Sequence, residues 1–481
     1  MSIARILAEL AIETAPQAFT RSSRDAALKM LLDTCGCAYC GMDAPGIREL
    51  IALEYELAAP GNGSVFFSER KLSLPSAAYS NAAMMHALDF DNNYPKADIH
   101  IMAMVVPVGL ACCEEAGASG RQFIDSVILG VEVAARIAKP YMSAKRQHSY
   151  FLTTSLVGGW GAVATAARLL GLTVDETVHA MGIYYAHTCG NRQALLEKSL
   201  TKRIQPAIAA KAALYSVLLA RRGITGPEQV FEGKGGFYRC YTQDEPPPRE
   251  TFTASAIHAI EELSVKHFPT CGIHHANIVS ALHLKREYGF EHGDIKQVDF
   301  FLHEGGGTLV SMPFLPGAYP QIDTQFCAPY AIALALNKAE VSVGDFDTKK
   351  ILEDTDTWEL AQRTREQVRF VDMNLKRYAE PRPDCKYTKV TLHDGRVFEH
   401  EQASGVLNDP ASMGVAEVRN KFRQCVTMHG DVDPAQVERI ADTILDVEQA
   451  DRMGEWIVHI FSKKPHAQMP SYCLADSSSA G

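Results

Sequence analysis

The pattern of apolar residues changes in kind part-way along the chain, and this change most constrains the fold. Up to about residue 240 the chain is dominated by helical periodicity. In SGRQFIDSVILGVEVAARIAKPY, the apolar residues Phe123, Val127 and Val131 recur on one helical stripe that Pro140 closes. The following segment TSLVGGWGAVATAARLLGL is full of small residues, which let helices approach closely. The sequence therefore predicts a buried helical bundle in this part of the chain.

A run of three prolines in TQDEPPPRE, residues 242–250, marks the end of this pattern, because prolines in a row cannot continue a helix. Beyond it, IKQVDFFLHEG at 295–305 alternates in part as a strand does. YTKVTLHDGRVFEHE at 387–401 predicts a hairpin with its turn at Asp394-Gly395. From about residue 405 the chain is helical again.

These segments predict a mainly α protein. We expect a large all-helical domain formed by both ends of the chain, residues 1–264 and 402–468. A smaller α+β domain is inserted at 265–401, and residues 469–481 form a disordered tail.

Composition narrows the class of protein. The 481 residues carry a formal net charge of −10, which argues against a nucleic-acid partner because such proteins need a basic face. The longest apolar run, Ile101 to Cys113, is shorter than the roughly 20 residues that cross a bilayer, so we expect no membrane partner. The first residues alternate charged and apolar types too early for a signal peptide, and the twelve cysteines fit a reducing compartment. We expect a soluble, cytoplasmic protein.

The stretch HALDFDNNYPKADIH, residues 86–100, concentrates ionisable side chains between two apolar segments. One interpretation is the polar floor of a buried pocket, where Asp89 and His100 exchange protons because desolvation shifts their pKa values. The other is a solvated loop in which the aspartates cap a helix. This stretch alone leaves both open.

A second cluster, SLTKRIQPAIAAKAAL, places Lys202 and Arg203 near the start of a helix. The helix dipole does not favour cations there. Their position makes sense if the cations and the helix amides together bind a carboxylate. The alternative is a solvated basic pair.

A third cluster, SVKHFPTCGIHHANIVSAL, contains Lys266, His267, Cys271, His274 and His275. Its C-x-x-H-H spacing matches none of the usual zinc patterns, so we expect no metal.

Together these stretches resemble the MmgE/PrpD family, which includes 2-methylcitrate dehydratase, cis-aconitate decarboxylase and iminodisuccinate epimerase. HALDFDNN…DIHIMAMVVP is similar to the family's H-x-x-D-F-D-D…H-P-x-x-x-V-x-P, and LTKRIQP to its T-K-x-x-H. KHFPTCGIHH resembles K-x-(Y/F)-P-x-C-x-x-x-H, and DTQFCAPYAIA resembles A-Q-F-S-x-P-Y-A. The four motifs occur in the family's order, over nearly the whole chain.

The resemblance implies that the inserted domain is a lid, that the active site lies between the two domains, and that the protein forms a homodimer. It implies no metal and no organic cofactor. The family's substrates are di- and tricarboxylates, and its common step is proton transfer at a carbon beside a carboxylate. Such a carbon is a weak acid, so the site must supply cations and a base.

Residue roles follow from the matched motifs. The resemblance implies these catalytic residues: Asp89, His100, Lys202, Lys266 and His275. It implies these substrate-binding residues: Asn93, Leu152, Arg203, Gln205 and Cys271. Lys202, Arg203 and Lys266 would neutralise carboxylates. Asp89 would orient His100 as the acid/base pair, and His275 would complete the pocket from the lid.

The chain also departs from the family pattern, which makes it a divergent member. Leu152 and Gln205 stand where the family has histidines, Ile101 replaces a proline and Asn92 replaces an aspartate. The pocket is therefore expected to be more apolar and less basic.

These departures bear on the reaction. We expect a dehydratase resembling 2-methylcitrate dehydratase, with an altered or alkylated substrate whose alkyl chain contacts Leu152. The alternatives are an epimerase or a decarboxylase on the same scaffold. Cys271 disfavours decarboxylation, because decarboxylases of the family have histidine at this position. A further alternative is a catalytically silent carboxylate-binding protein.

Overall fold

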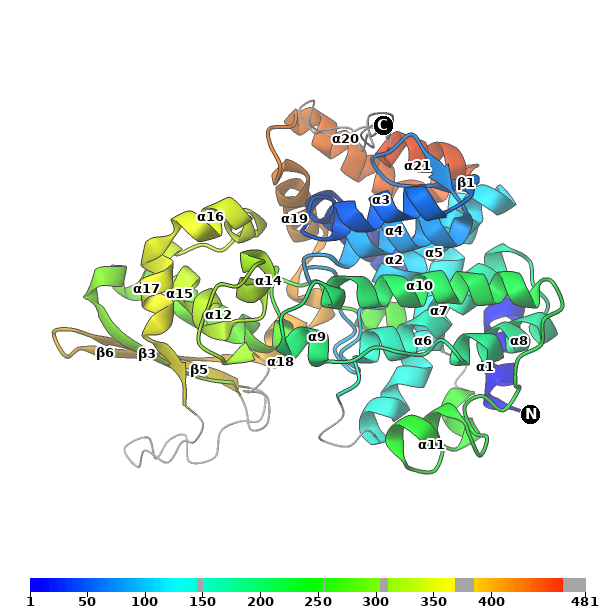
Figure 1. Ribbon diagram of the computed structural model, residues 1–481, viewed down its shortest axis with the longest axis horizontal. Coiled ribbons are helices and arrows are strands. Elements are labelled where there is room, and N and C mark those ends of the chain that lie inside the picture. Colours follow the sequence, from blue (N-terminus) through cyan, green and yellow to red (C-terminus); the bar gives the residue numbers. More distant parts are fainter. Residues whose placement is uncertain (145–149, 254–255, 303–309, 368–384, 462–481) are drawn as a thin grey trace, which may run out of the picture.

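Helices make up most of the computed structural model, as the sequence predicts, so the mainly α class is confirmed (Figure 1). The structure describes residues 1–144, 150–253, 256–302, 310–367 and 385–461. The predicted tail at 469–481 and the end of the strand-like segment, 303–305, lie outside the described residues. Within these ranges no helix is long and apolar enough to cross a membrane.

The larger part of the molecule is a stack of helices, and its core includes side chains from Ile3 to Val265 and from Val418 to Phe461. Its helices are α1 (Ile3–Glu13), α2 (Arg21–Gly41), α3 (Ile47–Leu57), α4 (Leu74–His86), α5 (Met102–Ala116), α6 (Gly120–Ala144), α7 (Thr153–Leu169), α8 (Val174–Tyr185), α9 (Gln193–Leu196), α10 (Thr201–Ala220), α11 (Phe237–Thr242), α19 (Val415–Thr427), α20 (Pro434–Leu445) and α21 (Met453–Phe461). A short ribbon, β1 (Pro60–Ser64) with β2 (Lys71–Leu72), joins α3 to α4.

Small residues allow these helices to pack closely, as expected. A Cβ atom on Gly161 of α7 would lie 2.4 Å from the carbonyl oxygen of Gly130 on α6. One expectation was wrong: α6 does not stop at Pro140 but continues to Ala144. The proline lies in the last turns of the helix, where a lost backbone hydrogen bond disturbs few others.

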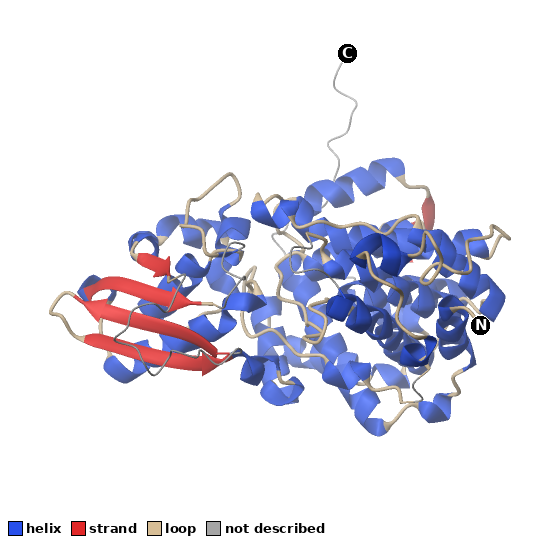
Figure 2. Cartoon of the chain, turned by 90° about the horizontal axis from the view of Figure 1, so that it is seen from below, coloured by secondary structure: helices blue, strands red, loops and turns tan. Residues whose placement is uncertain are grey.

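The smaller part of the molecule is built on a four-stranded sheet at one end of the molecule (Figure 2). The strands are β3 (Ile295–Phe301), β4 (Thr364–Glu366), β5 (Cys385–Leu392) and β6 (Val397–Ala403), in the order β4-β3-β5-β6. The predicted hairpin is confirmed: β5 and β6 are antiparallel, and Gly395 has a φ of +90°, which glycine adopts without strain.

Helices cover this sheet and form a second core with it. They are α12 (His275–Tyr288), α14 (Pro320–Gln325), α15 (Ala328–Lys338), α16 (Thr348–Glu353), α17 (Thr355–Gln362) and α18 (Ser404–Asn408). Helix α12 packs on β5 and β6, and α15 packs on α12 and β4.

The two cores exchange side chains at their boundary: Leu195 of α9 belongs to the second, and Val343 to the first. The domain limits and the lid role of the smaller part stay predictions.

Candidate active site

A cavity of about 270 Å³ lies where the two parts of the molecule meet. The helical part contributes the end of α4 and the loop after it, the starts of α7 and α10, and residues near α9. The smaller part contributes Lys386 of β5, the segment around Cys271, and α18. Its lining residues are His86, Asp89, Asn93, Pro95, Asp98, His100, Leu152, Thr154, Arg192, Leu195, Lys202, Lys266, Cys271, Gly272, Ile273, Phe326, Lys386, Ser404 and Asn408.

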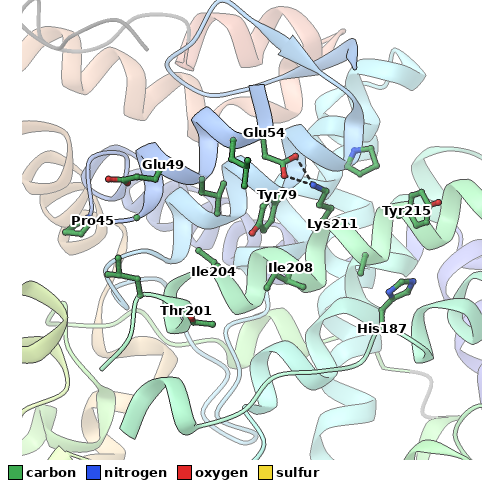
Figure 3. A pocket seen from close by; sticks show the side chains of 16 residues that line it. Pro45, Glu49, Glu54, Tyr79, His187, Thr201, Ile204, Ile208, Lys211 and Tyr215 are labelled. Carbon is green, nitrogen blue, oxygen red and sulfur yellow. Dashed lines mark hydrogen bonds and ion pairs between the residues drawn. The ribbon is translucent and has the colours of Figure 1, made fainter. Parts of the chain in front are cut away.

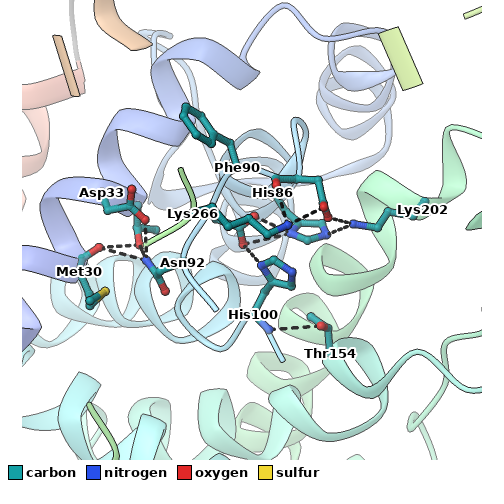
Figure 4. Close-up of polar contacts among 12 residues, drawn as sticks. Met30, Asp33, His86, Phe90, Asn92, His100, Thr154, Lys202 and Lys266 are labelled. Carbon is teal, nitrogen blue, oxygen red and sulfur yellow. Dashed lines mark hydrogen bonds and ion pairs between the residues drawn. The ribbon is translucent and has the colours of Figure 1, made fainter. Parts of the chain in front are cut away.

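Asp89 is held between two ammonium groups at this cavity, those of Lys202 and Lys266, which are the two lysines labelled in Figure 4. Lys202 donates to its Oδ1, and Lys266 Nζ lies 2.6 Å from its Oδ2 and 2.8 Å from its backbone oxygen. Burial by itself would raise the pKa of Asp89, but Lys202 and Lys266 outweigh it and hold the pKa well below its ordinary value. Asp89 is therefore a permanent anion that fixes the two lysines.

The backbone explains how Asp89 reaches them. Helix α4 ends at His86, and Asp89 adopts a φ of +52°, a left-handed conformation that few residues other than glycine take up. This turn directs the chain away from the helix, so that Asp89 and Asp91, two residues apart, meet different partners.

Asp91 is fully buried between two imidazoles. Its carboxylate oxygens each lie 3.0 Å from His86 Nδ1, and its Oδ2 lies 3.2 Å from His100 Nδ1. Burial would raise the pKa of Asp91, but His100 and His86 lower it well below its usual range. Asp91, and not Asp89, is thus the carboxylate that contacts His100. The expected pairing of Asp89 with His100 is corrected, because Asp89 faces the lysines.

His86 has a fixed proton position. Lys202 Nζ lies 3.0 Å from its Nε2, and an ammonium group can only donate. His86 Nε2 must therefore accept, and the ring proton sits on Nδ1, facing Asp91. Burial lowers the pKa of His86 to about 4. His86 is neutral at neutral pH and serves to connect Lys202 to Asp91.

His100 differs from His86 in having a ring nitrogen to spare. Its Nδ1 lies beside Asp91, and its backbone N–H donates to Thr154 Oγ1 at 3.2 Å. Among the described residues, its Nε2 makes no hydrogen bond. In a general base of this type, one nitrogen of the imidazole lies beside a carboxylate, and the other nitrogen faces the cavity without a hydrogen-bond partner.

The remaining predicted residues divide into two groups. Asn93, Leu152 and Cys271 line the cavity with Asp89, His100, Lys202 and Lys266. Burial raises the pKa of the Cys271 thiol to about 11, so it is a neutral group at neutral pH.

Arg203, Gln205 and His275 do not line the cavity. Successive residues of a helix point about 100° apart, so Arg203 cannot share the direction of Lys202. Arg203 donates instead to Pro45, Gln321 and Gln325.

The side chains of Gln205 and His275 also bind groups of the protein itself, in both cases groups of the backbone. The Gln205 side chain binds both the backbone N–H and the backbone oxygen of Asn191, at 2.7 and 3.0 Å. His275 Nε2 lies 3.2 Å from Thr270 O, and burial lowers the pKa of His275 well below its ordinary value. Their expected contact with substrate is therefore not made at this cavity.

A buried lysine from the C-terminal part of the chain binds the backbone of two segments that carry site residues. Lys421 of α19 lies 2.7 Å from Asp33 Oδ1 and donates to the backbone oxygens of Phe90 and Lys266, at 2.6 and 3.1 Å. Asn92 donates to Asp33 Oδ2 at 3.0 Å. The family-divergent asparagine therefore anchors the loop that carries Asp89 and Asp91 (Figure 4).

Sequence reasoning missed several of these groups. His86 and Asp91 lie within the quoted motif, whose spacing could have singled them out. Lys421, Arg192 and Lys386 lie in none of the four motifs, and only the fold brings them to the site.

His86, Asp91 and His100 are close enough to hold a metal ion by distance alone. Asp91, however, already faces the proton on His86 Nδ1, and the Lys202 ammonium group lies against the other nitrogen. The donor set therefore fits a chain of polar contacts through Asp91 better than a cation site.

A second, larger cavity of about 760 Å³ lies on the helical part, between α3 and α10 (Figure 3). Its walls are mostly apolar, with Ile204, Ile208 and Tyr215 among them, and its ion pair is Lys211 with Glu54. It lacks the paired imidazoles and lysines of the smaller cavity, so we place the candidate chemistry in the smaller one.

Comparison with known proteins agrees with the motifs. The model of the MmgE/PrpD N-terminal domain matches residues 2–250, and that of the MmgE/PrpD C-terminal domain matches residues 268–447. A cis-aconitate decarboxylase-like protein, oryM, from Aspergillus oryzae is 24% identical over 90% of this chain and 91% of its own length. A cis-aconitate decarboxylase from Aspergillus terreus is 24% identical over 87% of this chain and 88% of its own, and that of Homo sapiens is 27% identical over 50% and 51%. With both domain models matched over most of its length, the chain belongs to the MmgE/PrpD family.

Proposed function

We propose that the protein is a lyase that acts on a di- or tricarboxylate by removing a proton from the carbon beside a carboxylate. The observation that carries this proposal is the pairing of His100 with Asp91, in one cavity with the Lys202–Asp89–Lys266 cluster.

The charge of the cavity favours an anionic substrate. Its lining carries four cations and two carboxylates, and the histidines add no charge when neutral. The cations are Arg192, Lys202, Lys266 and Lys386, and the carboxylates are Asp89 and Asp98. The charge stays positive when the Asp91 carboxylate beside the two histidines is added, and this local excess favours an anionic substrate against the global charge of −10.

The chemistry follows from the two clusters. His100 Nε2 takes the proton from carbon, and Asp91 stabilises the imidazolium that forms. Negative charge then develops on the substrate carboxylate, and the Lys202 ammonium group stabilises it. In the main proposal, dehydration, the C–O bond at the neighbouring carbon breaks. The hydroxyl leaves as water with the proton that His100 holds.

Decarboxylation is the second candidate, favoured by the names of the relatives that match most of the chain. In that reaction His100 first takes a proton from solvent, the C–C bond to a carboxylate breaks, CO2 leaves, and His100 donates its proton to the electron pair left on the substrate. The residues involved are the same, and the fate of the electron pair differs. An alkyl group on the substrate would meet the apolar side chain of Leu152, which lines the cavity.

Proton NMR in D2O tests the proposal. The purified protein is incubated with citrate, 2-methylcitrate, cis-aconitate, iminodisuccinate and alkylated citrates. Loss of a C–H signal reports proton removal, and the product signals distinguish dehydration, decarboxylation and epimerisation. His100→Ala should reduce exchange by about 100- to 10,000-fold, as expected for loss of a general base.

The matched control is His258→Ala, because His258 is an exposed histidine outside the cavity. It should exchange at the wild-type rate. Wild-type exchange by His100→Ala would refute the assigned role of His100. Saturable binding of tricarboxylates without exchange would instead support a silent binding protein.

A further inference from the structure

Most hydrogen-bond donors of the cavity lysines are already in use. The three N–H groups of Lys266 meet three acceptors: Asp89 Oδ2, Asp89 O and Thr270 O, at 2.6, 2.8 and 3.1 Å. Lys202 uses two of its three N–H groups to donate to Asp89 and His86. Lys386 donates to Leu302 O at 2.6 Å. Lys266 therefore has no donor to offer a substrate, and Lys202 has one.

Arg192 is in a different position. It lines the cavity with a side chain that is 21% exposed, and its nearest carboxylate oxygen, Asp98 Oδ2, is 4.0 Å from its Nη2. Within the ranges that the structure describes, its guanidinium makes no hydrogen bond. A guanidinium has five N–H donors, in a fork that fits both oxygens of a carboxylate.

The backbone of Arg192 is nevertheless held in place. Its N–H donates to Tyr150 O at 2.7 Å, and its carbonyl accepts from Leu195, at 3.0 Å. Leu195 packs into the second core and also lines the cavity. The backbone of Arg192 is thus fixed, while its guanidinium has only the distant Asp98 as an ionic partner.

We propose that Arg192 is a specificity residue that binds a second carboxylate of the substrate, while the remaining Lys202 N–H binds the carboxylate at the reacting carbon. This inference rests on the proposed function and deepens it. Asp98, whose side chain is 62% exposed, is the neighbour that a substrate carboxylate displaces. The site then selects polycarboxylates over monocarboxylates by two separated cationic contacts.

Calorimetric titration of the full chain tests this with two probes: tricarballylate, which has three carboxylates, and butyrate, which has one. Arg192→Gln should weaken tricarballylate binding by about 10- to 100-fold, the usual effect of losing a charged bidentate contact. It should change butyrate binding by less than about threefold. Arg192→Lys keeps the charge without the fork and should fall between. Arg222→Gln is the matched control and should bind as wild type, because Arg222 is exposed in the turn after the end of α10 and outside the cavity.

A second variant keeps the test valid even if the Arg192→Gln protein fails to fold. Asp98→Asn removes the competing carboxylate and should tighten tricarballylate binding while leaving butyrate unchanged. In turnover assays, Arg192→Gln should raise KM with little change in kcat, because the residue binds ground state and transition state alike.

The outcomes separate the two proposals. Equal losses for both probes, or wild-type tricarballylate affinity in Arg192→Gln, would overturn the role of Arg192 and leave the lyase proposal intact. If the wild type binds tricarballylate and loses it in Arg192→Gln, but shows no exchange in D2O, the inference stands and the lyase proposal fails. If the wild type binds neither probe, the inference fails.

Discussion

Replacement of Lys421 by methionine tests the buried network behind the site. Methionine preserves much of the side-chain volume and removes the charge and all three donors. Lys421 is 3% exposed and Asp33 is 1% exposed, so the substitution leaves a carboxylate in the core without its cation. Breaking a buried ion pair in this way costs about 3–5 kcal/mol. That is a large part of the about 5–15 kcal/mol by which proteins are usually stable.

The structure also predicts which second change restores stability. Asp33→Asn in the same chain removes the uncompensated charge, so the double variant should be more stable than Lys421→Met alone. The control is Lys349→Met, because Lys349 is 82% exposed and 3.9 Å from Glu353. It should change the free energy of unfolding by less than about 0.5 kcal/mol, as surface ion pairs contribute little.

Urea unfolding followed by circular dichroism measures these differences, with fluorescence as a second probe of cooperativity. Turnover should fall as well, because Lys421 donates to the backbone carbonyls of Phe90 and Lys266. Phe90 follows Asp89 in the chain, and the side chain of Lys266 binds Asp89. A Lys421→Met protein within about 1 kcal/mol of wild type would refute the premise that Asp33 is a buried charge that depends on Lys421.

Two further predictions concern acid stability and assembly. Burial lowers the pKa of His86 to about 4 and that of His274 to about 3, so the unfolded chain, with pKa values near 6.5, binds more protons below that pH. The contribution of these histidines to the free energy of unfolding should be fully present above about pH 6.5. Below that pH the free energy of unfolding should fall by about 1.4 kcal/mol per pH unit per histidine, down to about pH 4. Equal urea midpoints at pH 7 and pH 5 would contradict this. We also expect a homodimer, with a second copy covering the exposed Ile208 and Tyr215 of the apolar cavity (Figure 3). Tyr215→Glu should then halve the mass measured by light scattering, and an unchanged mass would exclude this interface.

Periodicity and turn chemistry were enough to predict the mainly α class and the β5–β6 hairpin, because both are local properties of the chain. Motif spacing also led to the lysines and the histidine of the cavity. It did not show that Asp91 rather than Asp89 contacts His100, because that choice depends on the left-handed turn at Asp89.

The other differences have a tertiary origin. Arg203 and Gln205 follow Lys202 closely in sequence, but the direction of each depends on how α10 is rotated against its neighbours. Arg192 lies in no motif and reaches the cavity only because Tyr150 and the second core fix the backbone around it. A linear pattern contains none of this information.

The bond from Lys421 to the carbonyl of Phe90 joins residues 331 positions apart, and this separation has a consequence for biosynthesis. Ribosomes add roughly 5–20 residues per second, so the loop that carries Asp89 and Asp91 leaves the ribosome roughly 20–60 seconds before Lys421 is made. During that interval Asp33 has no cation, and the face of α2 that α19 later covers is open to solvent. The loop that carries Asp89 and Asp91 therefore cannot be anchored in its final position until the residues of α19 have left the ribosome.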